Sequence, residues 1–405
     1  KMLDLPHIVP EYENSNCSAC RLDCGSRLQL AGHGHKKILI VFDAQDAIQQ
    51  TTKTYFCGSR YTYVRDLLYK YGITTDDIWM TSTIQCYSEY KEEQHAIHCK
   101  PNLIKTIKRL KPVLVIGFGE FTAKMLLSYI IEDGIFLDRV HGWVHPNREL
   151  GCNMMFTYTP HPGSAKYKTI EEFIIERDVH MAIKSLAKPP DTYTPENKCV
   201  RLLEPKEAAM WLRDRINDKT ERFSALDYET NCLKPYNPAA KLYSCAVCED
   251  RDNSYAFKID DTTYSLMREY WATKHIRKIA HNSAFERMWT MVKLKVMPRR
   301  LIADTMLLAH VLDNRDVKWL SIKFIGPMLT GCSVWNGHIE SYLEPSKQDK
   351  KLYGEYALNR VASIPIRQLL TYNAIDSLVE FRTFFKLYEM LKNFYGTFPI
   401  ESESE

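Results

Sequence analysis

Two carboxylates in the C-terminal half of the sequence have a spacing that suits a divalent cation. Asp227 and Glu229 lie two residues apart in Phe223–Glu229, a run that we predict to be a β-strand, so both side chains point to one face. Adjacent carboxylates repel each other unless a cation lies between them. An isolated Asp-x-Glu pair is usually a solvated surface feature, so the interpretation depends on the residues that accompany it.

Two further segments place polar groups at helical spacing. In Ile279–Glu286 a strand is predicted to run into a helix whose first turn carries Asn282 and Glu286, four residues apart and therefore on one face. Tyr372 and Asp376 repeat that spacing. The alternative interpretations are that Asn282 is a helix cap and that Asp376 is a surface acid. For the segments to have no common function, every such alternative would have to be true at the same time.

Three ordered motifs result: Asp227-x-Glu229, Asn282-x-x-x-Glu286 and Tyr372-x-x-x-Asp376. They resemble the exonuclease motifs in the proofreading domain of family-A DNA polymerases, in the tyrosine-bearing branch of the DEDD superfamily. Asp304-Thr-Met-Leu-Leu resembles the segment after the second motif, and the resemblance covers roughly residues 199–395. The family usually has aspartate where this chain has Glu286, and the extra methylene could shift the second metal or weaken catalysis.

The resemblance implies hydrolysis of DNA from its 3′ end with two Mg²⁺ or Mn²⁺ ions about 4 Å apart. Carboxylate oxygens suit these hard cations. Asp227 would bridge the ions, Glu229 and Asp376 would complete the tighter site, and Glu286 would help to position the outer ion. Tyr372 would orient the attacking water, because a normal pKa of about 10 makes it a poor free base.

Other side chains near these motifs have less specific interpretations. His281 is interpreted as a packing residue or a phosphate contact rather than a metal ligand. The stretch from Ser321 to Pro365 could be an added loop or lid over the strand entry. Tyr228, Phe285 and Trp335 could stack on a terminal base, although a core role is commoner for each.

The N-terminal half carries a different set of metal-type ligands. Cys17 and Cys20 form a Cys-x-x-Cys pair, Cys86 and Cys99 follow far downstream, and Cys24 is a fifth candidate. The spacing does not match a single zinc finger. By spacing alone, a structural zinc site and an iron–sulfur cluster fit equally well.

Further landmarks flank these cysteines: Cys17-Ser-Ala-Cys-Arg-Leu22, Gly32-His-Gly34, Phe56-Cys-Gly58, Leu110-Lys-Pro112, Gly117-Phe-Gly119 and Thr159-Pro-His-Pro162. In series they resemble the family 4 uracil-DNA glycosylases, α/β enzymes with a [4Fe–4S] cluster. The resemblance covers roughly residues 14–186. It implies that the cluster ligands are Cys17, Cys20, Cys86 and Cys99 and that Cys24 is a bystander.

The active-site loops depart from that family. Its Gly-Glu-Ala-Pro-Gly is replaced by Phe42-Asp-Ala-Gln-Asp46, which removes the tight backbone, although Asp43 still offers a carboxylate. Its uracil-reading asparagine appears as Ser82, which cannot present an amide's donor and acceptor together. Phe56 and His161 keep the positions for base stacking and leaving-group charge, with inherited framework as the alternative. We therefore expect a glycosylase-like domain that has lost catalysis and kept its cluster.

Such a domain could bind DNA, guide it to the exonuclease or dock a replication partner. Four basic residues are candidate phosphate contacts or, equally, a solvated helix face. They are Lys105, Lys108, Arg109 and Lys111.

The elements that position these side chains fall into two α/β runs on either side of Ala187–Lys198, a proline-containing linker. Predicted strands before it are Lys37–Phe42, Asp77–Thr81 and Pro112–Gly117. After it, the predicted strands are Phe223–Glu229, Lys241–Cys248 and Ser254–Ile259, and the predicted helices are Ser283–Leu294, Thr305–Leu312 and Ile366–Leu391. The expected domains are a glycosylase-like α/β domain with a parallel sheet (1–187), a linker (188–198) and a ribonuclease H-like exonuclease domain with a mixed sheet (199–405).

Composition sets broad limits. The 405 residues are 45% hydrophobic and 26% charged, with a formal charge of +4, which is too mild to argue for nucleic acid. No apolar run approaches 18 residues, so no membrane partner is expected. Twelve cysteines without a secretion signal suggest reduced thiols or metal ligands, and hence the cytoplasm, that of a bacterial host if the gene is carried by a phage.

The combination of modules resembles replication proteins of large bacteriophages. It implies a 3′–5′ exonuclease for single-stranded or frayed 3′ DNA ends, acting in proofreading or end processing beside a DNA polymerase or another replication protein. A free-standing enzyme, a subunit acting in trans and a fragment of a longer polymerase remain alternatives, and so does a preference for RNA. Two other functions stay open: a bifunctional uracil-DNA glycosylase and exonuclease, and a non-catalytic DNA-binding assembly subunit.

Overall fold

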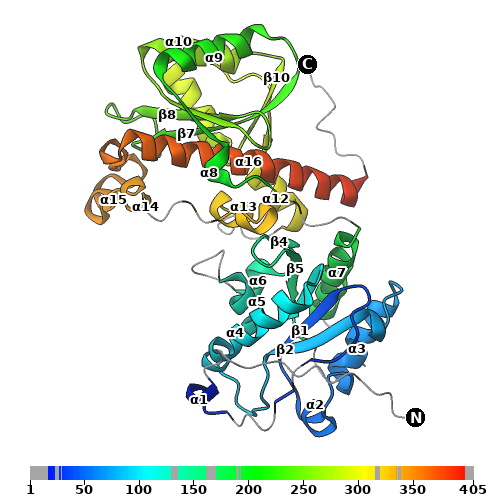
Figure 1. Ribbon diagram of the computed structural model, residues 1–405. Helices are drawn as coiled ribbons and strands as arrows, with labels where there is room; N and C mark the ends of the chain where they lie inside the picture. Colours follow the sequence, from blue (N-terminus) through cyan, green and yellow to red (C-terminus); the bar gives the residue numbers. More distant parts are fainter. Residues whose placement is uncertain are drawn as a thin grey trace. The chain divides into compact units, whose positions relative to one another are not determined.

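The computed structural model describes residues 17–22, 27–28, 30–128, 136–160, 170–187, 191, 193–314, 320–333, 335 and 339–396. It divides into two compact units, Lys1–Thr192 and Tyr193–Glu405. Each unit has its own sheet and its own hydrophobic core (Figure 1). Among the described residues, no helix has the length and apolar character needed to cross a membrane.

The sheet of the first unit is parallel except at one edge. Its strands run in the order β2-β1-β3-β5-β4, and only β4 pairs antiparallel with its neighbour. The strands are β1 Ile38–Ala44, β2 Ile78–Ile84, β3 Leu114–Phe118, β4 His145–Asn147 and β5 Cys152–Thr157. The two apolar runs predicted to be buried parallel strands are β1 and β3, and the further predicted strand Asp77–Thr81 overlaps β2, which confirms the predicted fold class for this half.

Helices cover both faces of this sheet. They are α1 Cys17–Cys20, α2 Ala47–Thr52, α3 Gly58–Tyr69, α4 Glu93–Leu110, α5 Glu120–Leu127, α6 Leu137–Val140 and α7 Ile170–Ser185, with a 3₁₀ turn η2 at Thr75–Asp77. Figure 1 shows α3 and α7 on one side of the strands and α4 and α5 on the other. Buried aliphatic and aromatic side chains fill the space between α3, α7 and the sheet.

The sheet of the second unit is mixed, as predicted. Its order is β11-β10-β7-β8-β9-β6, with β7, β10 and β11 parallel, β8 antiparallel to both β7 and β9, and β6 parallel to β9. The strands are β6 Val200–Leu203, β7 Arg222–Thr230, β8 Leu242–Cys248, β9 Ser254–Lys258, β10 Ile276–Ala280 and β11 Leu301–Asp304.

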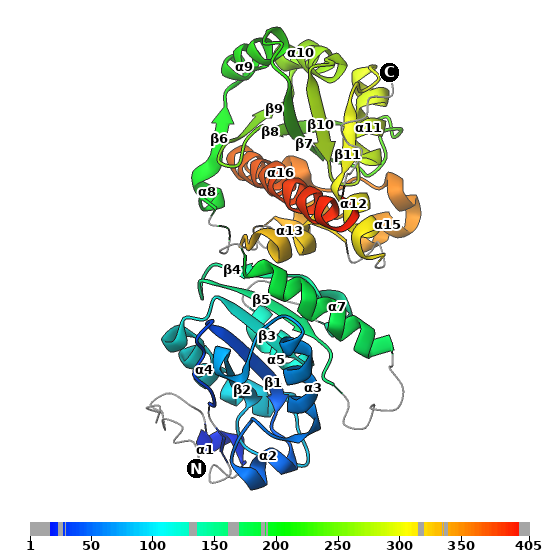
Figure 2. The same cartoon turned by 90° about the vertical axis from the view of Figure 1, so that its right-hand side faces the viewer.

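The helical elements of the second unit are as follows: α8 Glu196–Cys199, α9 Pro205–Asn217, α10 Asp261–Ala272, α11 Ala284–Trp289, the π-helical turn η4 Thr290–Leu294, α12 Thr305–Asp313, α13 Ile322–Thr330, α14 Glu340–Leu343, α15 Lys347–Tyr353, η6 Gly354–Tyr356, η7 Val361–Ser363 and α16 Ile366–Tyr395. Helices α9 and α10 pack on one face of the sheet and α16 on the other (Figure 2).

Strand β7 divides its side chains between these two faces. Leu226 and Tyr228 join the core beneath α9 and α10. The residues that alternate with them, Asp227 and Glu229, therefore point to the face that α16 covers. Alanines in β8 and β9 pack directly against α16 there, so the small side chains let the helix approach the sheet closely.

Three sequence-based expectations were wrong in detail. Asn282 does not lie on a helical face with Glu286, because its φ of 58° is left-handed and α11 begins only at Ala284. The stretch from Ser321 to Pro365 contains α13, α14 and α15 and is not simply a loop or lid. The end of the predicted linker forms α8.

Candidate functional site

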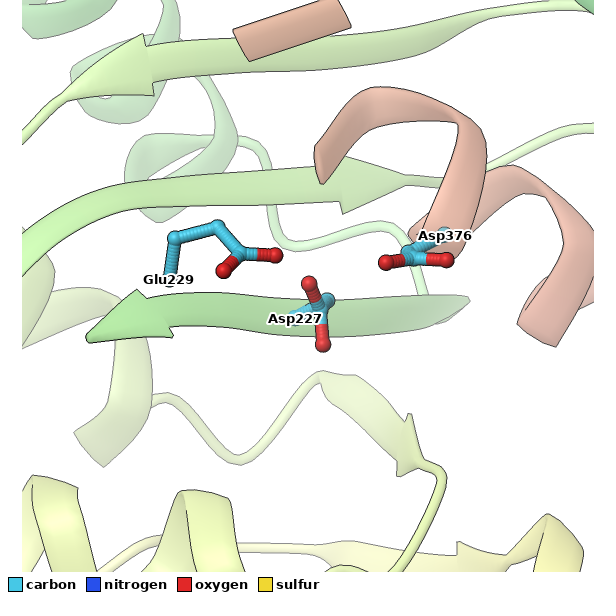
Figure 3. A group of neighbouring side chains, drawn as sticks. All are labelled: Asp227, Glu229 and Asp376. Carbon is cyan, nitrogen blue, oxygen red and sulfur yellow. The ribbon is translucent and has the colours of Figure 1, made fainter. Parts of the chain in front are cut away.

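Three carboxylates from two elements meet on the face of the sheet beneath α16. Asp227 and Glu229 of β7 and Asp376 of α16 each offer one oxygen, and these three oxygens all lie within 4.8 Å of one another. Figure 3 shows the three side chains turned toward a common point between strand and helix. Glu229 is 8% exposed and Asp376 5% exposed, so water screens their repulsion poorly.

Several side chains hold this group in place. Lys323 of α13 forms an ion pair with Asp376, and the indole N–H of Trp335 donates to the same Asp376 oxygen over 2.7 Å. The Lys323 ammonium also lies 4.1 Å from the centre of the Tyr372 ring and 4.3 Å from that of Trp335. The side-chain amide of Asn373 donates to Asp227.

The electrostatics of the group oppose full ionisation. Burial, followed by the charge of Asp376, raises the pKa of Asp227 well above its ordinary value. Burial, followed by the charge of Asp227, does the same to the pKa of Glu229. The Lys323 charge acts in the opposite direction on both groups. Such a cluster is stable with all its charges only if further positive charge is supplied.

Tyr372 lies one helical turn before Asp376 and is 6% exposed. Burial, and then the charge of Asp376, raises the pKa of the Tyr372 hydroxyl well above its ordinary value. The hydroxyl therefore remains protonated at neutral pH, where it can donate or accept a hydrogen bond but cannot act as a phenolate base.

Glu286 lies outside the group of three but close to it. It is 2% exposed on α11, and its Oε2 receives no hydrogen bond from the described residues. Burial, followed by the charge of Asp227, raises the pKa of Glu286 well above its ordinary value. The second motif therefore does bring its acid to the same centre, without a place in the tight triad.

Asp304 fixes the turn that delivers Glu286. Its carboxylate accepts the backbone N–H groups of Asn282 at 3.0 Å and Ser283 at 2.8 Å, just before α11 begins. The same carboxylate caps α12 by accepting the Met306 N–H at 2.9 Å. The sequence flagged Asp304 only as part of a segment after the second motif, and its positioning role was not foreseen.

Three residues of this site were missed from sequence: Lys323, Asn373 and Glu380. Glu380 follows Asp376 by four positions on α16, a spacing that could have pointed to it. Lys323 lies on α13, a helix within the stretch that was expected to be a loop or lid.

Four side chains near the motifs had no specific predicted role, and each packs against different neighbours: His281, Tyr228, Phe285 and Trp335. Tyr228 is buried and packs against Trp271, and Phe285 packs against Trp289. Burial lowers the pKa of His281 to about 4, and its ring is hydrogen-bonded to the Thr305 hydroxyl at 2.8 Å. Of the three aromatics proposed to meet a terminal base, Trp335 is the one that contacts the acids.

The donor set fits a hard divalent cation. Ligand oxygens about 2.1 Å from one Mg²⁺ lie up to about 4.2 Å apart, which is close to the span of the triad. The ligands are all carboxylates, and burial together with the neighbouring negative charge raises the pKa of Asp227 and of Glu229, which a bound cation would offset. Asp227, Glu229 and Asp376 are therefore the residues that would hold the ion.

Three of the predicted cluster ligands lie on α1 and α4. Cys17 and Cys20 lie on α1, which packs against α4, where Cys99 is buried. Cys86 follows β2 and forms a backbone bridge with Arg27. After burial, the charges of Cys20 and Cys17 raise the pKa of Cys99. The remaining candidate, Cys24, lies outside the described residues.

Arg27 supplies positive charge to this cysteine group. Its guanidinium donates to the Cys17 sulfur over 2.6 Å, and its charge lowers the pKa of Cys99. Hydrogen bonds to sulfur stabilise thiolates, the form in which cysteine binds metal. The four predicted ligands and their arginine neighbour thus fit a cluster in their chemistry.

The glycosylase-like positions are occupied by internal contacts. One oxygen of Asp43 accepts the backbone N–H of Thr122 at 2.8 Å and its hydroxyl at 2.9 Å. Gly119 has a φ of 106°, and a Cβ there would lie 2.2 Å from the other Asp43 oxygen. The carboxylate thus fixes the start of α5.

The base-reading position is also enclosed. Ser82 is fully buried and is hydrogen-bonded to the Tyr55 hydroxyl at 2.6 Å and to the Ile84 carbonyl at 2.8 Å. Phe56 is half-buried and packs against Tyr61 in the core. His161 lies outside the described residues.

Comparison with known proteins finds a family match in the first unit. Residues 31–177 match the sequence profile described as the uracil DNA glycosylase superfamily. The first unit is therefore similar in sequence to that superfamily.

Two curated relatives match this half. A type-4 uracil-DNA glycosylase from Pyrobaculum aerophilum is 26% identical over 173 residues, which are 41% of this chain and 87% of that protein. Another, from Saccharolobus solfataricus, is 22% identical over 186 residues, covering 44% of this chain and 86% of that protein.

Solved structures of nucleases also resemble this chain. NrnC from Brucella melitensis has a TM-score of 0.36 at 17% identity and covers 50% of this chain and 86% of its own. RNase D from Escherichia coli, described as an exoribonuclease involved in structured RNA processing, has a TM-score of 0.35 at 15% identity, covering 48% and 45%.

Proposed function

We propose that the protein is a 3′–5′ exonuclease that hydrolyses DNA ends with two Mg²⁺ or Mn²⁺ ions. The observation that carries this proposal is the convergence of Asp227, Glu229 and Asp376, whose oxygens lie within 4.8 Å of one another, with Glu229 and Asp376 buried. The order and spacing of the motifs, which resemble those of family-A proofreading domains, support the direction of hydrolysis and the choice of DNA.

In this proposal each residue near the scissile phosphate has a distinct task. Bound ions would supply a nucleophile at neutral pH and relieve charge on the leaving 3′ oxygen. The protonated hydroxyl of Tyr372 orients the attacking water by a hydrogen bond, in keeping with its raised pKa. Asn373 holds the Asp227 carboxylate toward the common point. Glu286 helps to position the outer ion.

We further propose that the first unit is a glycosylase-like domain without glycosylase activity. Asp43 and Ser82 already make internal hydrogen bonds, so neither is presented for water activation or base reading. A [4Fe–4S] cluster bound by Cys17, Cys20, Cys86 and Cys99 would link α1 to the rest of the unit.

The proposed substrate is a single-stranded or frayed 3′ DNA end, met during proofreading or end processing beside a polymerase or another replication protein. Lys105, Lys108 and Arg109 are exposed on α4 and could contact phosphates, although Lys108 also pairs with Glu149 at 3.4 Å. We also propose, from the resemblance to phage replication proteins, that the protein acts in the cytoplasm of a bacterial host.

The deciding experiment is digestion of a 5′-labelled single strand in Mg²⁺ and in Mn²⁺ by anaerobically purified protein. Asp227→Asn is the test variant, and Glu269→Gln, an exposed acid on α10, is the control. We expect a ladder that shortens from the 3′ end and disappears only with Asp227→Asn. An intact strand with tight binding would instead favour the assembly subunit, and faster digestion of an RNA strand would overturn the DNA assignment.

Two measurements test the first unit. Iron analysis should give about four iron atoms per chain, lost in Cys99→Ser and retained in Cys57→Ser, a cysteine at the start of α3. A uracil-containing strand should release no free uracil. Release of uracil would favour the bifunctional enzyme, and full iron content in Cys99→Ser would refute the ligand assignment.

A further inference from the structure

Two pairs of buried polar side chains lie between helix α16 and the strands β8 and β9. The Ser244 hydroxyl donates to the side-chain carbonyl of Asn373 at 2.9 Å, and the hydroxyls of Ser254 and Ser377 are hydrogen-bonded at 2.7 Å. All four side chains are fully buried, beside the alanines that pack against α16. Because an unpaired buried polar group costs free energy, each pair favours one position of α16 on the sheet.

Asn373 links the first of these pairs to the group of three acids. Its side-chain N–H group donates to the Asp227 carboxylate and, over 3.3 Å, to the Asp227 backbone carbonyl, while its own carbonyl oxygen accepts from Ser244. An amide turned by 180° would set its oxygen against the carboxylate, which is two acceptors with no proton between them. By holding the oxygen end, Ser244 favours the orientation in which the N–H group stays on Asp227.

The register of the strands brings Ser244 to this place. In the antiparallel pair of β7 and β8, Ser244 lies opposite Glu229, and Ala246 lies opposite Asp227. Side chains directly opposite each other in such a pair project from the same face of the sheet, here the face beneath α16. Strand β8, which carries none of the three motifs, therefore contributes a hydroxyl that acts on Asp227 by way of Asn373.

We propose that Ser244 is a positioning residue of the candidate metal centre, which acts through the Asn373 amide to fix the direction of the Asp227 carboxylate. The inference rests on the proposed nuclease function and deepens it. Before an ion binds, the neighbouring acids repel Asp227, and a hydrogen bond of fixed direction holds its carboxylate among them. A carboxylate that is already in place binds an ion with less reorganisation, so the Ser244 hydroxyl supports both ion affinity and the chemical step.

The test compares Ser244→Ala with Ser254→Ala in the full chain. The control removes the same hydroxyl from the other buried pair, whose printed partners are Ser377 and, through it, the Ala374 carbonyl rather than an acid. Calorimetric titration with Mn²⁺ in the absence of DNA should show about tenfold weaker binding in Ser244→Ala and wild-type binding in Ser254→Ala. At saturating Mn²⁺, kcat for strand digestion should fall about tenfold in Ser244→Ala, with KM for the strand within about twofold because Ser244 is buried.

A double variant tests the path through Asn373. Asn373→Leu removes the amide and should weaken Mn²⁺ binding at least as much as Ser244→Ala. If Ser244 acts through that amide, adding Ser244→Ala to Asn373→Leu should cause no further loss of affinity. Losses that simply add would overturn the path through Asn373.

The remaining outcomes separate this inference from the nuclease proposal. Wild-type Mn²⁺ affinity and kcat in Ser244→Ala, or equal losses in Ser254→Ala, would overturn the positioning role. If the wild type digests no strand, the nuclease proposal fails, whereas the Mn²⁺ titrations still decide the positioning role. Should Ser244→Ala not fold, as judged by circular dichroism, Ser244→Cys decides by the same criteria, because a thiol has a similar shape and is a weaker donor.

Discussion

The two units each carry a carboxylate on a central strand, and they treat it in opposite ways. One oxygen of Asp43 on β1 accepts the amide and the hydroxyl of Thr122, and Gly119 leaves room for the other oxygen. Asp227 on β7 faces other acids and receives a single side-chain amide. A carboxylate that accepts hydrogen bonds from its neighbours has a structural role. A cluster of carboxylates with few donors is instead suited to bind a cation.

Asp227→Asn removes one carboxylate from the proposed cation-binding site and should have the largest effect on nuclease activity. Loss of about 4 kcal/mol of transition-state stabilisation by the ions corresponds to about a 10³-fold lower rate of strand digestion. In EDTA the same variant should unfold at a higher temperature than the wild type, because one repelling charge has been removed. Rates from labelled strands and melting curves by calorimetry check both expectations. Lower stability in EDTA would show that the acids do not repel each other in the folded state.

Tyr372→Phe separates the role of the hydroxyl from that of the carboxylates, because it leaves the carboxylates unchanged. It removes only the hydroxyl, so we expect digestion to slow by about 10²-fold, the lower end of what a positioned proton-handling group contributes. Mn²⁺ affinity should stay within about twofold of the wild type. A changed metal affinity would mean that the tyrosine acts through the ligands and not on the water.

The buried acids of the second unit make the stability of the folded protein depend on pH. In the folded second unit the pKa values of Glu229, Glu286 and Glu380 are raised above the unfolded value of about 4.3. Between those two values the folded state binds more protons, so the free energy of unfolding falls as pH rises. Each unit of upward pKa shift corresponds to roughly 1.4 kcal/mol.

Urea unfolding in EDTA at pH 5.5 and pH 8 measures this loss. Saturating Mg²⁺ should restore stability at pH 8, because ligand binding favours the folded state. Equal midpoints at the two pH values in EDTA would contradict the raised pKa values.

Asp43→Ala should give the smallest effect. It leaves the Thr122 amide and hydroxyl without their acceptor at the start of α5, which costs about 1–2 kcal/mol of stability. Digestion of labelled strands should be unchanged. A loss of nuclease activity in this variant would show that the strand carboxylates of the two units are functionally linked.

The regular parts of this arrangement could be predicted from sequence because they follow a fixed period. Alternation along β7 put Asp227 and Glu229 on one face, and the i, i+4 rule did the same for Tyr372 and Asp376. These arguments need only local geometry, and the strand and helix they require are present.

The rest depends on contacts between segments that are distant in sequence. The left-handed turn at Asn282 is held by Asp304, more than twenty residues further along. Gly326 in α13 permits the close approach of Val379, since a Cβ there would lie 2.3 Å from its Cγ1, yet in sequence it indicates a break. Glu380 looks like any surface acid until α16 is placed on the sheet.

Asp304 binds two separate backbone segments, which affects how far the length of the chain between them can vary. One carboxylate holds the backbone before α11 and the first turn of α12, so both ends of the intervening segment are tied to a single side chain. Residues can then be inserted around the exposed Lys295 and Met297 without shifting Glu286, since the change in length is absorbed between fixed ends. We expect natural length differences to accumulate in that segment.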